Sequence, residues 1–167
     1  LAEGADQLCA ETAVEMGLEI ITVLPMPVSE YAEDFESDAL KKLNELTERS
    51  SKAFIAPHKE PFKEGRDYLY RQAGLYIADH CHILFALWDG IPGEAGGCGT
   101  ASIVQAKLRN LTNGAAGEQL RRADGTVVQI MTPRVSRDCV NMEAGRIIIP
   151  ANSANRVSEK GTIRAFF

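Results

Sequence analysis

The stretch from residue 83 to residue 109 constrains the fold more than any other part of the chain. It begins with an apolar run, Ile83 to Trp88, continues through a loop with four glycines between residues 93 and 99, and ends in a segment from Thr100 to Arg109. An unbroken apolar run of this length is typical of a strand buried on both faces of a parallel sheet. The last segment places Ile103, Val104 and Leu108 at helical spacing. The order strand, glycine loop, helix therefore predicts an α/β unit.

The glycine loop also predicts an anion-binding site. Glycines let a ligand approach the backbone, and the first N–H groups of a helix point outward with the positive end of its dipole. Thr100 can cap the helix or turn its hydroxyl to a phosphate. The alternative is a tight turn whose glycines only allow close packing. The number of glycines favours a phosphate ligand, and the expected ligand-binding residues here are Asp89, Gly90, Gly96, Gly97, Gly99 and Thr100.

A second loop-to-helix step lies at the start of the chain. Gly4 precedes an amphipathic stretch over residues 5–16, and the β-branched, apolar residues 18–24 then predict a buried strand that ends at a proline. Ligands of doubly wound sheets bind beyond the carboxyl ends of the strands, so we expect the loops 25–35 and 89–100 to face one crevice. The expected ligand-binding residues at this step are Glu3, Gly4, Ala5 and Asp6.

Asp34 joins the expected binding residues because it follows a predicted strand, as Asp89 does. Either carboxylate can hold a ribose, a metal-bound phosphate or the edge of a base. The alternative role for both is turn capping, which aspartate performs readily. Trp88, the only tryptophan, either stacks on a base or closes the core.

The remaining pattern predicts an α/β fold: a Rossmann-like, doubly wound, mainly parallel sheet with helices on both faces. We expect a nucleotide-binding domain over residues 1–131 and a C-terminal extension over 132–167. Only three strands are clear, so either the chain begins after a first strand or the extension completes the sheet; the extension's other expected role is an oligomer contact. The further elements expected are helices over 38–49 and 65–79, strands over 126–131 and 146–149, and a loop over 50–64.

Composition narrows the class of partner. The net charge of −5 argues against nucleic acid or an anionic membrane as a partner. The four cysteines show no paired spacing, which favours a reduced, cytoplasmic protein. We expect a small-molecule nucleotide as the partner, no other cofactor, and a homo-oligomer as a further possibility.

Known phosphate motifs fit the glycine loop only in part. A P-loop requires a lysine before the Thr100 position, where Gly99 stands, and the dinucleotide fingerprint requires a third glycine or alanine where Ser102 stands. A metal site at His80 and His82 is disfavoured, because on a strand the intervening Cys81 points to the opposite face. We therefore expect no metal.

Five short motifs follow one another along the chain: Ala2-Glu3-Gly4-Ala5-Asp6, Leu24-Pro25-Met26-Pro27, Tyr31-x-x-Asp34-Phe35, Leu84 to Gly90, and Gly96-Gly97-x-Gly99-Thr100. In this order they resemble the SLOG superfamily. That group includes the DNA-processing protein A proteins, the "lonely guy" phosphoribohydrolases and nucleotide-sensing domains of bacterial conflict systems. The resemblance covers residues 1 to about 131 and implies a Rossmann-like fold that binds a nucleotide or nucleotide derivative through two glycine motifs.

The chain departs from the phosphoribohydrolase branch of this superfamily at one position. That branch carries a catalytic glutamate three residues after the threonine, and Ile103 stands there in this chain. An apolar side chain cannot act as an acid or a base. We therefore expect a protein that binds or senses a nucleotide without robust catalysis. The alternative is a nucleotide N-glycosidic-bond hydrolase whose carboxylate comes from elsewhere, from Glu3, Asp34 or Asp89; catalytic residues stay unassigned.

Overall fold

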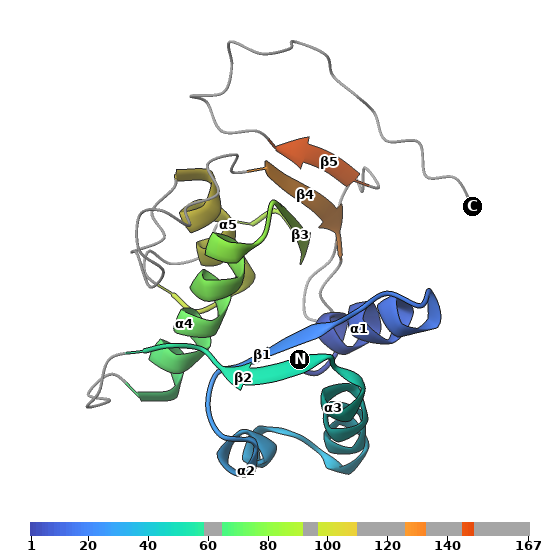
Figure 1. Ribbon diagram of the computed structural model, residues 1–167. Helices are drawn as coiled ribbons and strands as arrows, with labels where there is room; N and C mark the ends of the chain where they lie inside the picture. Colours follow the sequence, from blue (N-terminus) through green and yellow to red (C-terminus); the bar gives the residue numbers. More distant parts are fainter. Residues whose placement is uncertain (59–64, 92–96, 110–125, 133–144, 149–167) are drawn as a thin grey trace. The chain divides into compact units, whose positions relative to one another are not determined.

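A computed structural model describes residues 1–58, 65–91, 97–109, 126–132 and 145–148 of the chain (Figure 1). The chain divides into two compact units, Leu1–Ala73 and Gly74–Phe167, with the boundary inside helix α4 (Gly65–His80). None of the helices in the described ranges combines the length and the apolar character needed to cross a lipid bilayer.

The first unit is built around a two-stranded parallel sheet. β1 pairs with β2 so that Ile21 lies opposite Lys52 and Leu24 opposite Ile55. The chain connects the two strands through a helical crossover, which is the connection that parallel neighbours require. Its elements, in order, are α1 (Ala5–Glu15), β1 (Ile21–Leu24), α2 (Val28–Tyr31), the 3-10 helix η1 (Ala32–Asp34), α3 (Ser37–Arg49) and β2 (Lys52–Ile55).

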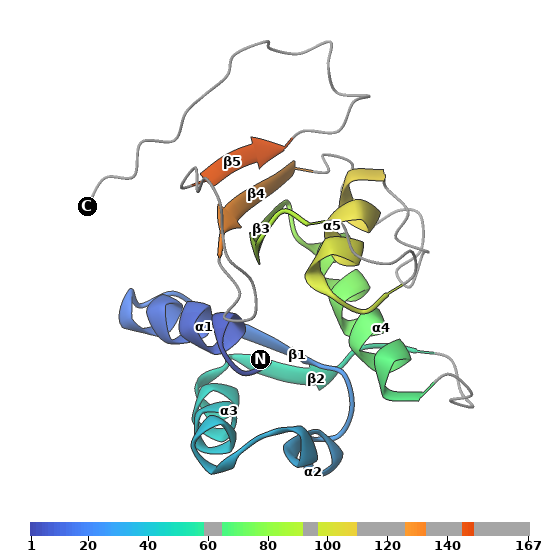
Figure 2. The same cartoon turned by 180° about the vertical axis from the view of Figure 1, so that it is seen from behind.

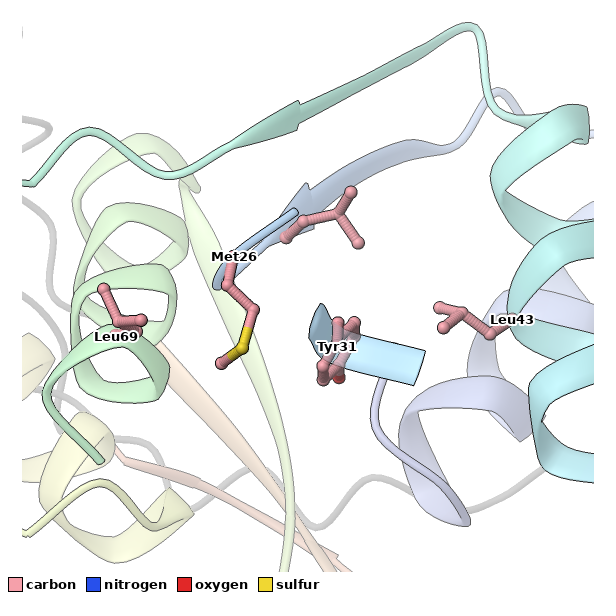
Figure 3. Close-up of a cluster of buried hydrophobic side chains, with 5 residues drawn as sticks. Met26, Tyr31, Leu43 and Leu69 are labelled. Carbon is pink, nitrogen blue, oxygen red and sulfur yellow. The ribbon is translucent and has the colours of Figure 1, made fainter. Parts of the chain in front are cut away.

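Apolar side chains from several elements form the core of this unit. Figure 3 shows Met26, which follows β1, and Tyr31 of α2 between Leu69 of α4 and Leu43 of α3. Leu43 is fully buried because Ala39, Leu43 and Leu46 recur at helical spacing on one side of α3. The core therefore fixes the segment after β1 against two helices.

The second unit contains a three-stranded sheet in the order β3-β4-β5. β3 (Ile83–Trp88) pairs in parallel with β4 (Thr126–Met131), and β4 pairs antiparallel with β5 (Gly145–Ile148). The two views in Figures 1 and 2 both show β4 between the other two strands. Helix α5 (Thr100–Arg109) follows β3 in the chain and contacts both β3 and β4.

Helix α5 packs on one face of the β3–β4 pair. The buried cluster on that face joins side chains of the two strands to α5: Ala86, Trp88, Val127, Ala101 and Val104. Alternate side chains of the strands leave the opposite face more accessible, because Ile83 is 49 % exposed and Phe85 is 62 % exposed. The prediction that residues 83–88 are buried on both faces is therefore wrong for this face.

The predicted fold class is confirmed, since helices alternate with parallel strands and pack against them in a Rossmann-like manner. Two details differ from the prediction. The strands form two sheets instead of one, and residues 52–55 of the predicted loop form β2. The short strand expected near residue 146 is present as β5, running antiparallel to β4. The domain boundary expected at residue 131 stays a prediction.

Candidate functional site

The last part of the glycine loop, Gly97 to Thr100, leads directly into α5 and is called the α5 turn below. Gly96 lies outside the described residues. The carbonyl of Gly99 accepts the N–H groups of Ser102 at 3.0 Å and Ile103 at 3.3 Å. The helix therefore winds from Gly99 onward, and its first N–H groups lie at the α5 turn, as expected for a helix start.

The first turn of α5 offers an anion no opposing charge. Thr100 and Gly99 are exposed, and the first turn of α5, which is fully described, carries no acidic side chain. No carboxylate of that turn therefore opposes the positive end of the helix dipole. An exposed hydroxyl, outward N–H groups and this dipole together favour a phosphate.

Neither close packing nor a left-handed backbone requires a glycine at position 99. A Cβ atom built on it meets no other atom of the described structure within 4 Å, and its φ lies outside the left-handed range. Close packing and backbone conformation, the two usual reasons for a glycine, therefore do not account for this residue. Two reasons remain: glycine is a favoured residue directly before a helix, and it lets a ligand approach the backbone.

The strand end that leads into the glycine loop is held by side chains. The indole N–H of Trp88 donates to the carbonyl of Ile91 at 2.9 Å, and the carboxylate of Asp89 accepts the Ile91 N–H at 3.1 Å. Gly90 has a φ of 80°, and a Cβ there would lie 3.1 Å from the amide nitrogen of Gln129. These contacts give Asp89 and Gly90 structural roles in the turn.

The turn at the start of α1 is built differently. Gly4 adopts a φ of 91°, a value that side chains rarely permit, so the backbone itself requires glycine here. Its carbonyl accepts the Leu8 N–H at 3.0 Å. Asp6 is exposed, belongs to the first turn of α1 and accepts the Ala2 N–H at 3.2 Å. A negative charge already occupies the position where an anion would benefit from the α1 dipole.

A hollow of about 310 Å³ lies between α1 and α3, and Glu3 and Gly4 line it. Its lining includes three carboxylates, those of Glu3, Glu11 and Asp38, and one cation, Lys42, whose ammonium nitrogen lies 2.9 Å from Glu11. Acidic side chains therefore outnumber basic ones, which disfavours a phosphate in this hollow. Ala5 is half-buried at the start of the helix.

Gln7 is a buried polar residue of the same hollow that the sequence analysis missed. Its side-chain amide donates to the carbonyl of Ala39 at 2.9 Å and is 3 % exposed, so it ties α1 to α3. A glutamine inside a helical pattern gives no signal of burial in the sequence.

Asp34 is engaged by two side chains of α4. Its carboxylate accepts a hydrogen bond from the Arg66 guanidinium at 2.7 Å and another from the Tyr70 hydroxyl. Arg66 also donates to the carbonyl of Glu30 at 2.9 Å. Burial raises the pKa of the Asp34 carboxyl, but the hydrogen bonds from Arg66 and Tyr70 outweigh it and hold the pKa below its usual value. These contacts fix the segment 30–34 onto α4.

The predicted site residues thus fall into separate groups, each of which lies within one of the two units. Glu3, Gly4, Ala5 and Asp6 gather at the start of α1, and Asp34 belongs to the Arg66–Tyr70 cluster. In the second unit, Trp88 of the strand that precedes Asp89 and Gly90 shares a buried cluster with Ala101 of α5. The single crevice expected for the two loops stays a prediction.

Ile103, which stands where the phosphoribohydrolase branch has its glutamate, packs between helices. It is 8 % exposed and belongs to a buried cluster with Leu75, Ala78 and Ala106. A Cβ on Gly74 of α4 would lie 2.8 Å from the Ile103 side chain, so the glycine makes room for it. This position serves the contact between α4 and α5.

The segment from His80 to His82 is not a strand, contrary to the premise of the metal prediction, since α4 ends at His80 and β3 begins at Ile83. His80 is the last residue of α4, its Nδ1 lies 2.8 Å from the Tyr76 carbonyl, and its ring stacks on Tyr76 with centroids 3.9 Å apart. Within the described ranges, no group of three His, Cys, Asp or Glu side chains is placed to hold a metal ion.

Comparison of the chain with family models, with curated proteins and with solved structures gives no match. The site must therefore be interpreted from its own chemistry.

Proposed function

We propose that this chain binds a nucleotide or nucleotide derivative, with a phosphate of the ligand at the α5 turn, and that it does so without robust catalysis. The observation that carries the proposal is Gly99. It is an exposed glycine, at the start of a helix without acid in its first turn, and neither packing nor conformation requires it. Glycine is favoured before a helix, and at this exposed position it also leaves the helix N–H groups accessible to an anion.

The residues before the α5 turn support a nucleotide of the kind bound by SLOG proteins. The five motifs of that resemblance end in the Gly96–Thr100 stretch, and the α/β setting with a strand before the loop and a helix after it agrees with such a site. In open α/β sheets, ligands bind at the carboxyl ends of strands, where β3 leads into this loop.

Binding without cleavage is favoured over hydrolysis. The position of the expected glutamate holds Ile103, packed against Gly74. Two of the three substitute carboxylates already accept hydrogen bonds within the protein, Asp34 from Arg66 and Asp89 from the Ile91 N–H. A carboxylate held in this way is less suited to act as a nucleophile or base than one aimed at a substrate.

A thermal-shift series tests the proposal. Nucleoside mono- and diphosphates, with inorganic phosphate as the minimal ligand, should raise the melting temperature of the wild-type chain, because any ligand of the native state must do so. Gly99→Leu should abolish the shift by filling the approach to the helix N–H groups.

The matched control for that series is Glu36→Leu. Glu36 is the exposed residue before α3, without a side-chain cap hydrogen bond, so leucine is introduced at the start of a different helix. This variant should keep the ligand shift. A wild-type chain that shows no shift with the full panel, or a Gly99→Leu variant that retains it, rules the proposal out.

A further inference from the structure

Trp88 connects the two ends of the glycine loop. At the start of the loop, its indole N–H donates to the Ile91 carbonyl at 2.9 Å. Its ring is 8 % exposed and belongs to the same buried cluster as Ala101 and Val104 of α5, just beyond the end of the loop. The Trp88 side chain therefore contributes to two places: the turn that follows β3 and the packing of the start of α5.

Gln129 of β4 holds the other side of this strand end. It is fully buried, and its side-chain amide donates to the Trp88 carbonyl at 3.3 Å and contacts the Met131 sulfur at 3.1 Å. The same nitrogen would lie 3.1 Å from a Cβ at position 90, so Gly90 allows the turn to sit against it. A buried polar group with defined partners specifies one arrangement of its surroundings.

We infer that Trp88 is a positioning residue for the proposed phosphate site, backed by Gln129, and that Asp89 acts through the same turn instead of on the ligand. This inference rests on the proposed function. The indole holds the exit from β3 through Ile91 and packs in the cluster that seats the first turn of α5, whose N–H groups bind the phosphate in this proposal. Geometry of this kind governs affinity, because a loop already held in its binding arrangement loses less freedom when the ligand arrives.

Trp88 can report ligand binding at the α5 turn. It is the only tryptophan of the chain, so the protein gives one indole N–H signal in a nitrogen–proton correlation spectrum. A ligand at the α5 turn should shift that signal along a single titration curve, with the same dissociation constant that calorimetry gives. The probe is whichever of inorganic phosphate and the nucleoside mono- and diphosphates produces a thermal shift with the wild-type chain. This measurement needs no variant.

A pair of variants separates positioning from general stability. Trp88→Phe keeps an aromatic ring in the cluster and removes the indole donor. Val127→Ala truncates a fully buried side chain of the same cluster on β4. Both should lower the melting temperature of the free protein. Only Trp88→Phe should weaken ligand binding in calorimetry, by about fivefold, the effect of one lost hydrogen bond.

Each outcome bears on the inference. A moving indole signal together with an affinity loss confined to Trp88→Phe supports it. A wild-type chain that binds the probe while the indole signal stays still, or a Trp88→Phe variant with wild-type affinity, overturns it and leaves the proposed function intact. Equal affinity losses in both variants assign Trp88 to stability alone and also overturn it. If no probe binds, the proposed function fails first and the inference falls with it.

Discussion

Helices α1 and α5 both begin at a glycine after a loop, yet the two glycines serve different needs. Gly4 adopts a φ of 91°, so the bend of the chain requires it. Gly99 lies outside the left-handed range, and a Cβ there would meet no atom of the described residues within 4 Å. The first glycine is explained by conformation, whereas we propose that the second gives a ligand access to the helix start.

The charges around the two helix starts differ in the same sense. Asp6 stands in the first turn of α1, and the carboxylates of Glu3 and Asp38 line the hollow beside it. The first turn of α5 has no acidic residue. A helix dipole attracts a negative charge most strongly at its first turn. At α1 the protein's own carboxylates already supply that charge, whereas at α5 a ligand can supply it. A glycine followed by a helix is therefore not enough to predict a phosphate site. The prediction also depends on whether acidic side chains lie in the first turn of that helix.

The largest expected effect comes from placing at position 103 of α5 the glutamate that the phosphoribohydrolase branch carries there. Ile103→Glu places a carboxylate in the contact between α4 and α5, where Ile103 is 8 % exposed and lies against Gly74. We expect the free energy of unfolding to fall by on the order of 3 kcal/mol, because a buried charge without a partner is strongly unfavourable. Denaturant unfolding measures the loss.

The control for this variant is Gln105→Glu, which adds the same charge at a half-buried position of α5. It should change the unfolding free energy by less than about 1 kcal/mol. Release of free base from a nucleoside monophosphate by a folded Ile103→Glu protein would contradict the packing role assigned to this position.

The second effect separates the two glycines directly. Gly4→Ala should lower the free energy of unfolding by roughly 2 kcal/mol, since alanine is forced into a backbone conformation it disfavours. Gly99→Ala should cost less than about 1 kcal/mol, the difference between glycine and alanine at a helix start. Urea unfolding of both variants gives the two values.

Ligand binding by the same two variants should show the opposite order. Gly99→Ala should weaken the thermal shift given by nucleoside monophosphates, and Gly4→Ala should leave it unchanged once the lower starting temperature is taken into account. Equal binding losses in both variants would remove the distinction between the α1 and α5 turns.

How far the sequence predicts this fold depends on how local each signal is. The helix over 65–79 and the strands over 83–88 and 126–131 are found within a residue or so, because their apolar spacing is regular over six residues or more. β2 is missed because Lys52 to Ile55 is only four residues long and three of them are exposed. The splitting of the strands into two sheets depends on pairing between distant segments, which no local pattern records.

The sequence identifies the residues of the candidate site, but it does not predict the role of each one. The glycines and Thr100 are visible as a motif, whereas the hydrogen bonds of Asp34 to Arg66 and Tyr70 join residues more than thirty positions apart. Sequence left two roles open for Trp88, and burial in the cluster with Ala101 favours the core role. Gln129 gave no signal, since a polar residue in a strand is ordinarily placed on the solvent side.

A smaller effect should come from giving the α5 turn the acid that α1 already has. Thr100→Glu should raise the free energy of unfolding by about 0.5 kcal/mol through the helix dipole, while repulsion of the phosphate abolishes the ligand shift. Ala5→Glu, at the first position of α1, is the control and should leave ligand binding unchanged. Thermal melts with and without ligand measure both quantities. Retained binding by Thr100→Glu would place the phosphate elsewhere.

The smallest effect concerns Asp34, the predicted ligand residue whose carboxylate accepts hydrogen bonds from Arg66 and Tyr70 in the first unit. Because these partners hold the pKa of Asp34 below its unfolded value, its contribution to stability is present above that unfolded pKa and disappears as the pH falls through the folded one. Burial and the hydrogen bond to Asp34 raise the pKa of Tyr70 to about 12, so the contribution of Tyr70 is complete below pH 10 and is lost as the pH rises toward 12.

Asp34→Asn should therefore flatten the acid side of a plot of stability against pH, and Tyr70→Phe the alkaline side. Both variants should bind nucleotides as the wild type does, because the α5 turn does not include these side chains. A loss of nucleotide binding in Asp34→Asn with unchanged pH dependence of stability would show that Asp34 contacts the ligand.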